Sequence, residues 1–263
     1  MPEGHTIHRI ARDQRRDLVG QPVRASSVQD RFAGGAERLD DQVLRRVEAW
    51  GKHLFHWYEG GDLLHVHLGL IGKWQRRPQP APPPVGAVRL RLEGEGNAWD
   101  LSGPMICRIV TPDDRDAVVA KLGPDPLRPD ADPARMWARL QRSAKPIGLL
   151  LMEQDVVAGI GNVYRSELLS IAGIDPRRPG RDVTRPEFDA LWAEMVRQLR
   201  LGVRRNRIVT MAPAEIGRPI SRLARGDGRY AYKQDACGRC GTPLDVFPLA
   251  GRTTWACPTC QPG

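Results

Sequence analysis

The sequence predicts an α+β multidomain protein, in which an N-terminal antiparallel β-sandwich with a flanking helix precedes a helical domain and a C-terminal β-hairpin. Three features support this prediction. Short strand-like segments follow one another from residue 21 to about residue 110, helical periodicity replaces them after residue 122, and two Cys-x-x-Cys pairs lie close to the end. Strands followed by helices are typical of α+β folds or of separate domains. We expect domains at residues 1–122, 123–228 and 229–263.

The charge balance of the chain favours a polyanionic partner. The 263 residues include 40 Lys and Arg against 31 Asp and Glu, for a net charge of +9. Ten basic and only four acidic residues lie between Leu201 and the end. Nucleic acid is therefore the first candidate partner and an acidic membrane surface the second. No apolar run approaches the roughly 20 residues of a membrane span, and no signal peptide is visible, so we expect a cytoplasmic protein.

The chain begins with a candidate nucleophile. Residues 3–18 have helical periodicity and end at Gly20, which places Pro2 at a helix N-terminus. Removal of the initiator Met would leave Pro2 with a free secondary amine beside the carboxylate of Glu3, a pair suited to iminium formation and proton transfer. The helix dipole should lower the pKa of that amine below its usual value of about 8. The alternative is that Pro-Glu only opens the helix.

In the next segments, apolar and polar residues alternate as they do in β-strands. They lie at residues 22–28, 42–50, 53–58, 63–68, 87–92 and 105–110. Turn signals such as Gly34-Gly35 and Gly60-Gly61 separate them, and we expect the Pro-rich residues 76–86 to form an exposed loop. Together with the first helix they predict the sandwich.

Helical patterns follow the Gly-Pro-Asp-Pro turn at residues 123–126. They cover residues 133–143, 147–154, 163–171 and 186–203. Thr184 and Glu187 have the spacing of a capping box at the start of the last helix. We expect the basic residues 205–232 to be irregular.

Four cysteines predict one structural metal site. Cys237 and Cys240 form one Cys-x-x-Cys pair, and Cys257 and Cys260 form the other. Two such pairs on a hairpin are typical of a tetrahedral Zn²⁺ site, and four thiolates leave no open position for catalysis. A segment this short buries little core, so the ion would hold it together. Arg252 would lie at the hairpin turn.

Three further turns carry candidate site residues. Lys52 follows Gly51 between two strands, Leu70 and Ile71 lie in a Gly-bounded turn, and Asn162 ends the Gly-Ile-Gly turn before a helix. An exposed Leu70 or Ile71 could wedge into a base stack, although core packing is the simpler reading of this turn. Asn162 and its neighbouring backbone N–H groups could hold a phosphate.

Two histidines also form a pattern. His65 and His67 alternate on one face of a strand. A metal site is one interpretation, and hydrogen-bonded histidines beside a polar site are the better one.

Four motifs in this order resemble the formamidopyrimidine-DNA glycosylase and endonuclease VIII family of base-excision repair enzymes. They are Pro-Glu-Gly at residues 2–4, Gly51-Lys52, the helix-two-turn-helix stretch at residues 151–167, and the terminal finger with Gly-Arg-Thr-Thr-Trp-Ala-Cys at residues 251–257. The likeness extends along the whole chain. It implies a DNA glycosylase and abasic-site lyase that acts as a monomer on damaged DNA, with one structural Zn²⁺.

The resemblance also implies residue roles. Pro2 would attack C1′ of a flipped-out nucleotide and form a Schiff base, and Glu3 would act as general acid and base. Lys52 is implied for β-elimination, and Arg252 for phosphate binding and δ-elimination. The DNA-binding residues that it implies are Leu70, Lys121, Lys145 and Asn162.

Substrate choice follows from smaller details. His5-Thr6 and Leu70-Ile71 look more like the endonuclease VIII branch, and residues 102–115 lack an Asp-Pro-Arg-Arg-Phe-Gly type of loop. We therefore expect oxidised pyrimidines and abasic sites in duplex DNA, with single-stranded or bubble DNA as an alternative context. Two other hypotheses are an oxidised-purine glycosylase and a damage sensor that no longer catalyses. The presence of Pro2, Glu3 and Lys52 together favours an enzyme.

Overall fold

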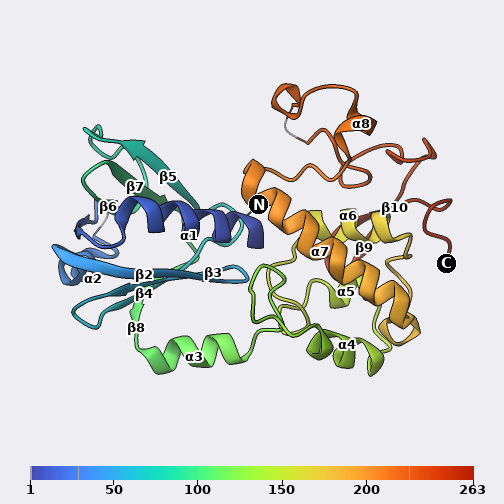
Figure 1. Ribbon diagram of the computed structural model, residues 1–263, viewed down its shortest axis with the longest axis horizontal. Helices are drawn as coiled ribbons and strands as arrows, with labels where there is room; N and C mark the ends of the chain where they lie inside the picture. The colour runs from blue at the N-terminus through green and yellow to red at the C-terminus, as the bar shows by residue number, and fades with distance from the viewer. Residues whose placement is uncertain (1, 29, 225) are drawn as a thin grey trace. The chain divides into compact units, whose positions relative to one another are not determined.

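The computed structural model describes residues 2–28, 30–224 and 226–263, so Met1 lies outside the described residues. The chain divides into two compact units, Met1–Lys121 and Leu122–Gly263. Figure 1 shows strands and one long helix in the first unit and mainly helices in the second. Each unit is described by itself.

The first unit is an antiparallel β-sandwich. Its strands are β1 (Pro22–Ser26), β2 (Gln42–Trp50), β3 (His53–Tyr58), β4 (Leu63–His67), β5 (Lys73–Pro78), β6 (Val88–Glu93), β7 (Asn97–Ser102) and β8 (Ile106–Val110). They pair in the order β5-β7-β6-β1-β2-β3-β4-β8. Strand β1 pairs with β2 at its first two residues and with β6 at its last three, so it joins the two layers.

One apolar core holds the sandwich and its helix together. Helix α1 (Gly4–Leu18) contributes Ile7 and Leu18, which are buried against residues such as Leu44 of β2 and Leu92 of β6. Each such side chain contributes about 1.5–3 kcal/mol when fully buried. The predicted helix at residues 3–18 and the predicted antiparallel sandwich are thus confirmed.

Four elements of this unit were absent from the sequence prediction. Helix α2 (Ala33–Leu39) forms through Gly34-Gly35, which the sequence indicates as a turn, because Ala36 and Leu39 are buried on the core. Strand β5 includes the first residues of the predicted Pro-rich loop. Strand β7 buries Asp100 between Arg91 and Arg77, which a strand pattern of alternating apolar residues does not reveal. Helix α3 (Pro112–Ala120) has no buried residue and begins with a capping box at Thr111.

The second unit is built around a helical core. Its helices are α4 (Pro133–Gln141), α5 (Ile147–Leu150), α6 (Asn162–Ala172), α7 (Arg185–Arg205) and α8 (Pro213–Ile216), with short 3-10 turns η1 (Gly180–Asp182) and η2 (Ile220–Arg222). Buried Leu168, Phe188 and Leu199 connect α6 and α7. Both the Thr184 backbone N–H and hydroxyl donate to Glu187 Oε2, at 2.7 and 2.8 Å, as the capping-box spacing predicts.

The second unit also carries a two-stranded hairpin. Strands β9 (Asp245–Leu249) and β10 (Arg252–Ala256) pair antiparallel, and β10 packs on α6. Throughout residues 2–28, 30–224 and 226–263, every helix is too short or too polar to cross a lipid bilayer.

Candidate functional site

The first candidate residues lie at the start of α1. Pro2 is half-buried and precedes the helix, and Glu3 is its N-cap residue in extended backbone conformation. The Glu3 carbonyl oxygen accepts from the Thr6 N–H at 2.9 Å, and the Glu3 residue is fully buried. The nitrogen of Pro2 therefore lies beyond the first turn of the helix, where the positive end of the helix dipole disfavours a protonated amine.

The Gly51-Lys52 turn lies at the same end of this unit as Pro2 and Glu3. Arg15 Nε of α1 donates to the Val47 carbonyl of β2 at 2.6 Å, and α1 and β2 are antiparallel (Figure 1). From this contact, the path back along α1 to Gly4 and the path forward along β2 to Lys52 therefore lead to the same end of the sandwich. The rise from Arg15 back to Gly4 is about 16 Å along a helix. The rise from Val47 to Lys52 along a strand is also about 16 Å. The two segments therefore reach the same level of the sandwich.

Buried and half-buried histidines lie on the strands that follow Lys52. His53 pairs with His67 across β3 and β4, and His53 Nδ1 lies 2.9 Å from His65 Nε2. Burial is the main cause that lowers the pKa of His53 to about 3, and the charge of Lys52 adds to it. Burial likewise lowers the pKa of His65 to about 4. The histidines are thus neutral, stacked and hydrogen-bonded at neutral pH.

The alternative interpretation of His65 and His67 as metal ligands has no support in the geometry. Within the described part of the chain, the grouping of three or more His, Cys, Asp or Glu ligand atoms that could hold a metal ion consists of the four cysteines. His65 instead stacks on Phe55 with 4.6 Å between ring centroids.

The turn between β4 and β5 carries exposed apolar side chains at the same end. Leu70 is 56% exposed and Ile71 is 83% exposed. The turn is closed by a hydrogen bond of 3.0 Å from the Gly72 N–H to the Leu68 carbonyl. Core packing, the simpler reading of Leu70-Ile71, is therefore wrong, and both side chains are available to contact a partner.

In the second unit, Asn162 is the first residue of α6 and is tied to the hairpin. Asn162 Nδ2 donates to the Thr253 carbonyl at 3.0 Å. Arg165, one turn further along α6 and fully buried, donates to the Asn162 amide oxygen and to Thr254 Oγ1, the latter at 2.7 Å. The amide of Asn162 thus has a fixed orientation. Arg165 was not identified from the sequence, and the only signal for it is its Asn-x-x-Arg spacing on a helix.

A second buried charge of α6 anchors the basic segment that follows α7. Glu167 is fully buried and accepts from the backbone N–H groups of Tyr230, Ala231 and Tyr232 at 2.8, 2.9 and 2.7 Å. The Thr210 hydroxyl also donates to it. One carboxylate therefore holds both ends of residues 210–230. The sequence does not single out Glu167, because its partners are three backbone N–H groups and one hydroxyl, all more than 40 residues away.

Arg252 lies beside the hairpin turn. Leu249 pairs with Arg252, and the two residues between them, Ala250 and Gly251, have φ of +52° and +69°. Positive φ at both positions is the type I′ geometry that matches the twist of a two-stranded hairpin. The exposed Arg252 side chain is thus carried on a short, defined turn, directly before Thr253 and Thr254, which contact α6.

The four cysteines are gathered as a metal site requires. Their sulfur atoms all lie within 4.8 Å of one another. Cys237 Sγ lies 4.0 Å from Cys260 Sγ, and Cys240 Sγ lies 3.5 Å from Cys257 Sγ. Tetrahedral ligands at the Zn–S distance of about 2.3 Å are about 3.8 Å apart, so this donor set fits such an ion. Backbone N–H groups of Arg239 and Cys260 point to Cys237 and Cys257, which suits thiolates.

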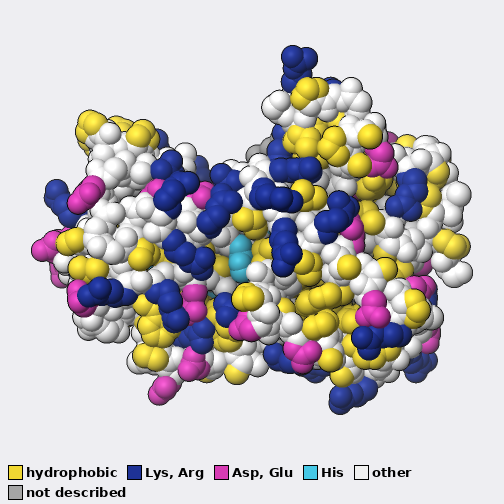
Figure 2. Space-filling model, in the orientation of Figure 1, with side chains coloured by type: hydrophobic (Ala, Val, Ile, Leu, Met, Phe, Trp, Pro, Cys, Tyr) yellow, Lys and Arg dark blue, Asp and Glu magenta, His cyan; other side chains and the backbone are white. Residues whose placement is uncertain are grey.

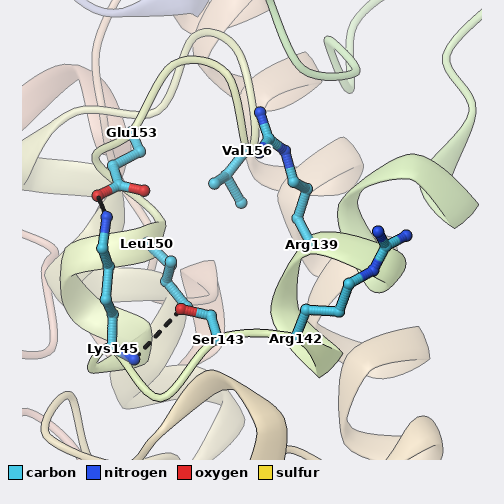
Figure 3. A pocket seen from close by; sticks show the side chains of 7 residues that line it. All are labelled: Arg139, Arg142, Ser143, Lys145, Leu150, Glu153 and Val156. Carbon is cyan, nitrogen blue, oxygen red and sulfur yellow. Dashed lines mark hydrogen bonds and ion pairs between the residues drawn. The ribbon is translucent and has the colours of Figure 1, made fainter.

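Lys145 lines a basic cavity of about 230 Å³ in the second unit (Figure 3). Arg139, Arg142 and Ser143 also line it, and Lys145 Nζ is paired with Glu153 Oε1 at 2.7 Å. Lys121 is exposed at the end of α3 in the first unit. Lys and Arg side chains are also spread over the face shown in Figure 2, including the region of α7.

Comparisons with known protein families match most of the chain. The formamidopyrimidine-DNA glycosylase N-terminal domain matches residues 1–103, and the formamidopyrimidine-DNA glycosylase H2TH domain matches residues 122–213. The chain is 46% identical to Endonuclease 8 1 of Mycobacterium tuberculosis over 267 aligned residues, which cover 99% of this chain and 100% of the relative. It is 31% identical to the formamidopyrimidine-DNA glycosylase of Stutzerimonas stutzeri, with 99% and 100% covered.

Solved structures share the fold. Lactococcus lactis Fpg in complex with DNA containing N7-benzyl-Fapy-dG has a TM-score of 0.80 and 22% identity, with 100% of both chains covered. At that identity the likeness establishes the fold alone. This shared fold agrees with the predicted order of domains along the chain, which is sandwich, helical region and cysteine-bearing hairpin.

Proposed function

The chain belongs to the formamidopyrimidine-DNA glycosylase and endonuclease VIII family of DNA glycosylases and abasic-site lyases, and from that premise we propose that it removes oxidised pyrimidines from DNA and cleaves the strand at the resulting abasic site. The observation that carries the proposal is that the Pro2-Glu3 segment and Lys52 lie at the same end of the sandwich. Binding alone requires neither an N-terminal Pro nor the carboxylate beside it.

In the proposed reaction, the Pro2 amine forms a bond to C1′ while the glycosidic bond breaks and its electron pair leaves with the base. The Pro2 nitrogen then loses its N–H proton, and Glu3 gives a proton to the ring oxygen as the C1′–O bond breaks and the sugar opens, which leaves an iminium between Pro2 and C1′. Loss of a C2′ proton then expels the 3′ phosphate, and a second elimination expels the 5′ phosphate. Lys52 assists the first elimination and Arg252 the second.

The remaining roles concern DNA binding. Asn162, Lys121 and Lys145 contact backbone phosphates, and Leu70 occupies the stack where the damaged nucleotide has left. The orientation of the Asn162 amide by Arg165 and Thr253 supports its part, because a fixed donor loses little entropy on binding an anion. The basic cavity around Lys145 supports contact with a phosphate.

One Zn²⁺ ion held by Cys237, Cys240, Cys257 and Cys260 completes the proposal. The sulfur spacing supports it, and when bound the ion supplies no reaction chemistry, because four thiolates leave no open position. It would stabilise the hairpin that carries Arg252. We propose three domains, at residues 1–122, 123–228 and 229–263, the last of which is the metal-binding segment. We also propose that the protein is a monomer that acts on nucleoid DNA in a bacterial cytoplasm.

The preference for pyrimidines is supported by the higher identity to Endonuclease 8 1, at 46%, than to three formamidopyrimidine-DNA glycosylases, at 31–32%. A panel of oligonucleotides with thymine glycol, dihydrouracil, 8-oxoguanine or an abasic site tests it. Each is offered in duplex and in single-stranded form to protein with a native N-terminus. Faster excision of the two pyrimidines is expected, with phosphate at both ends of the gap. Faster excision of 8-oxoguanine would overturn the substrate class, and binding of abasic DNA without cleavage would indicate a damage sensor.

A further inference from the structure

A cavity of about 230 Å³ lies in the second unit between the end of α4 and the segment that carries α5 (Figure 3). Its apolar lining consists of Leu150 and Val156, each 2% exposed. Arg139 and Arg142 are three residues apart at the end of α4 and line the cavity from one face of that helix. Sites that hold a whole drug-sized ligand measure about 300–1,000 Å³. This cavity, here called the α4 cavity, is smaller and suits a compact group.

Cations outnumber carboxylates around the α4 cavity. The charged residues of its lining are Arg139, Arg142, Lys145 and Glu153. Lys145 Nζ donates to Glu153 Oε1 at 2.7 Å, and Arg139 Nη2 donates to Asp155 Oδ2 at 2.7 Å. An ammonium group has three N–H donors and a guanidinium has five, so both side chains keep donors for an anion. The cavity therefore combines a net positive charge with unused donors.

Arg142 supplies a charge that no carboxylate of the described residues pairs with. Its side chain is exposed, and the ion pairs at the cavity are those of Arg139 and Lys145. Ser143 Oγ accepts from the Lys145 N–H at 3.2 Å, which leaves the hydroxyl hydrogen of Ser143 as a further donor. The helix dipole explains why cations are favourable at the end of α4. It does not explain Ser143 and Lys145, which follow the helix and line the same cavity.

The α4 cavity is connected to Asn162 through α5. Leu150 lines the cavity, and the carbonyl oxygen of Gly148, two residues earlier, lies 3.5 Å from Arg165 Nη1. Arg165 also donates to the Asn162 amide oxygen. One phosphate group in the cavity and another at Asn162 would therefore be held by one connected part of the second unit.

Convergent guanidinium, ammonium and hydroxyl donors are suited to a phosphate group. A phosphomonoester has three strong acceptor oxygens and a charge of about −1.5 to −2 at pH 7. A backbone diester has one negative charge and one free oxygen fewer. We propose that the α4 cavity binds a phosphomonoester, with Arg142 and Arg139 as its main ligands. The inference rests on the proposed function for one source of this group, because two eliminations leave a phosphomonoester on each side of the gap. A free phosphate compound is the other source.

The test measures the binding of undamaged, fluorescein-labelled single-stranded oligonucleotides to zinc-supplemented full-length protein by fluorescence anisotropy. The oligonucleotides end in a 5′-phosphate, a 3′-phosphate, a hydroxyl or a methyl-esterified phosphate. We expect wild type to bind a phosphate-ended oligonucleotide about 10-fold more tightly than the hydroxyl-ended and esterified ones, the size of one charge-assisted hydrogen bond. Arg142→Ala should lose this difference. Arg200→Ala, at an exposed position of α7, is the matched control and should keep it.

Calorimetry with deoxyribose 5-phosphate and with deoxyribose distinguishes the two sources. Equal binding of all oligonucleotides, together with binding of deoxyribose 5-phosphate that Arg142→Ala abolishes, would identify a free phosphate compound as the ligand. The proposal is overturned if wild type shows no preference for the phosphate in either assay, or if Arg142→Ala shows the same preference as wild type. These probes contain no lesion and are not cleaved, so cleavage of abasic-site DNA by wild type tests the proposed function separately.

Discussion

Arg165 and Thr254, 89 positions apart in the chain, are joined by a hydrogen bond of 2.7 Å between Arg165 Nη2 and Thr254 Oγ1, and neither residue is exposed to solvent. The same guanidinium donates to the Asn162 amide oxygen. The start of α6 and the strand that begins with Arg252 are therefore one polar unit. A change in this contact should affect stability and phosphate binding together.

Replacing Arg165 by Leu should lower the free energy of unfolding by about 2–4 kcal/mol, because Thr254 and Asn162 lose a charged donor in a buried site. Urea unfolding at constant pH measures the change. Arg200→Leu, at an exposed position of α7, should change the same free energy by less than about 0.5 kcal/mol. An Arg165→Leu protein as stable as wild type would show that the network adds nothing.

Removal of the metal should unfold the hairpin without unfolding the sandwich. Chelation, or Cys257→Ser, leaves buried thiols without the ion that holds the two Cys pairs together. Near-ultraviolet circular dichroism should report it, since the rings of Trp255 and Tyr232 lie 4.8 Å apart. Metal analysis should give one zinc per chain. Retention of full DNA affinity after chelation would contradict the role assigned to the finger.

Arg252→Ala should weaken DNA binding and reduce the slope of log K against log salt by about 1, as the loss of one phosphate contact does. Titration of abasic-analogue duplex at several salt concentrations measures the slope. Arg185→Ala removes a cation that is already paired with Asp189 at 2.9 Å and serves as the control. Weaker binding with an unchanged slope would mean that Arg252 does not touch the DNA backbone.

Acid should destabilise the sandwich through its histidines. Burial lowers the pKa of His53 and of His56 to about 3, and that of His65 to about 4. Their ordinary pKa is about 6.5, so the unfolded chain binds more protons between these values. The stability they contribute is complete above about pH 6.5 and is lost as the pH falls toward 4 for His65 and toward 3 for His53 and His56.

His65→Phe keeps the stacking on Phe55 and removes one titrating group. Unfolding of both proteins at pH 7 and pH 4.5 should show a fall in wild-type stability that exceeds the fall in the variant by about 2 kcal/mol. Identical pH dependence of the unfolding free energy in the two proteins would show that the pKa of His65 is the same in the folded and unfolded states.

Periodicity and turn residues were sufficient to predict the fold class, because α1 and most strands have one clear apolar face. They missed β7, where Asp100 is buried between two arginines, and α3, which has no buried face. In the candidate site, too, some residues could be predicted from the local sequence and others could not. Pro2, Asn162 and the cysteines belong to local motifs, whereas Arg165 and Glu167 matter through partners that only the folded chain brings near.

The most direct test of the account is borohydride trapping on abasic-site DNA, followed by peptide mapping of the adduct. The account predicts a covalent adduct on the peptide that begins with Pro2, formed only by protein from which Met1 has been removed. An N-terminal extension turns the amine into an amide and should abolish the adduct, while Glu3→Gln should slow its formation. An adduct on Lys52 instead, or none at all with a native N-terminus, would contradict the assignment of Pro2 as the nucleophile.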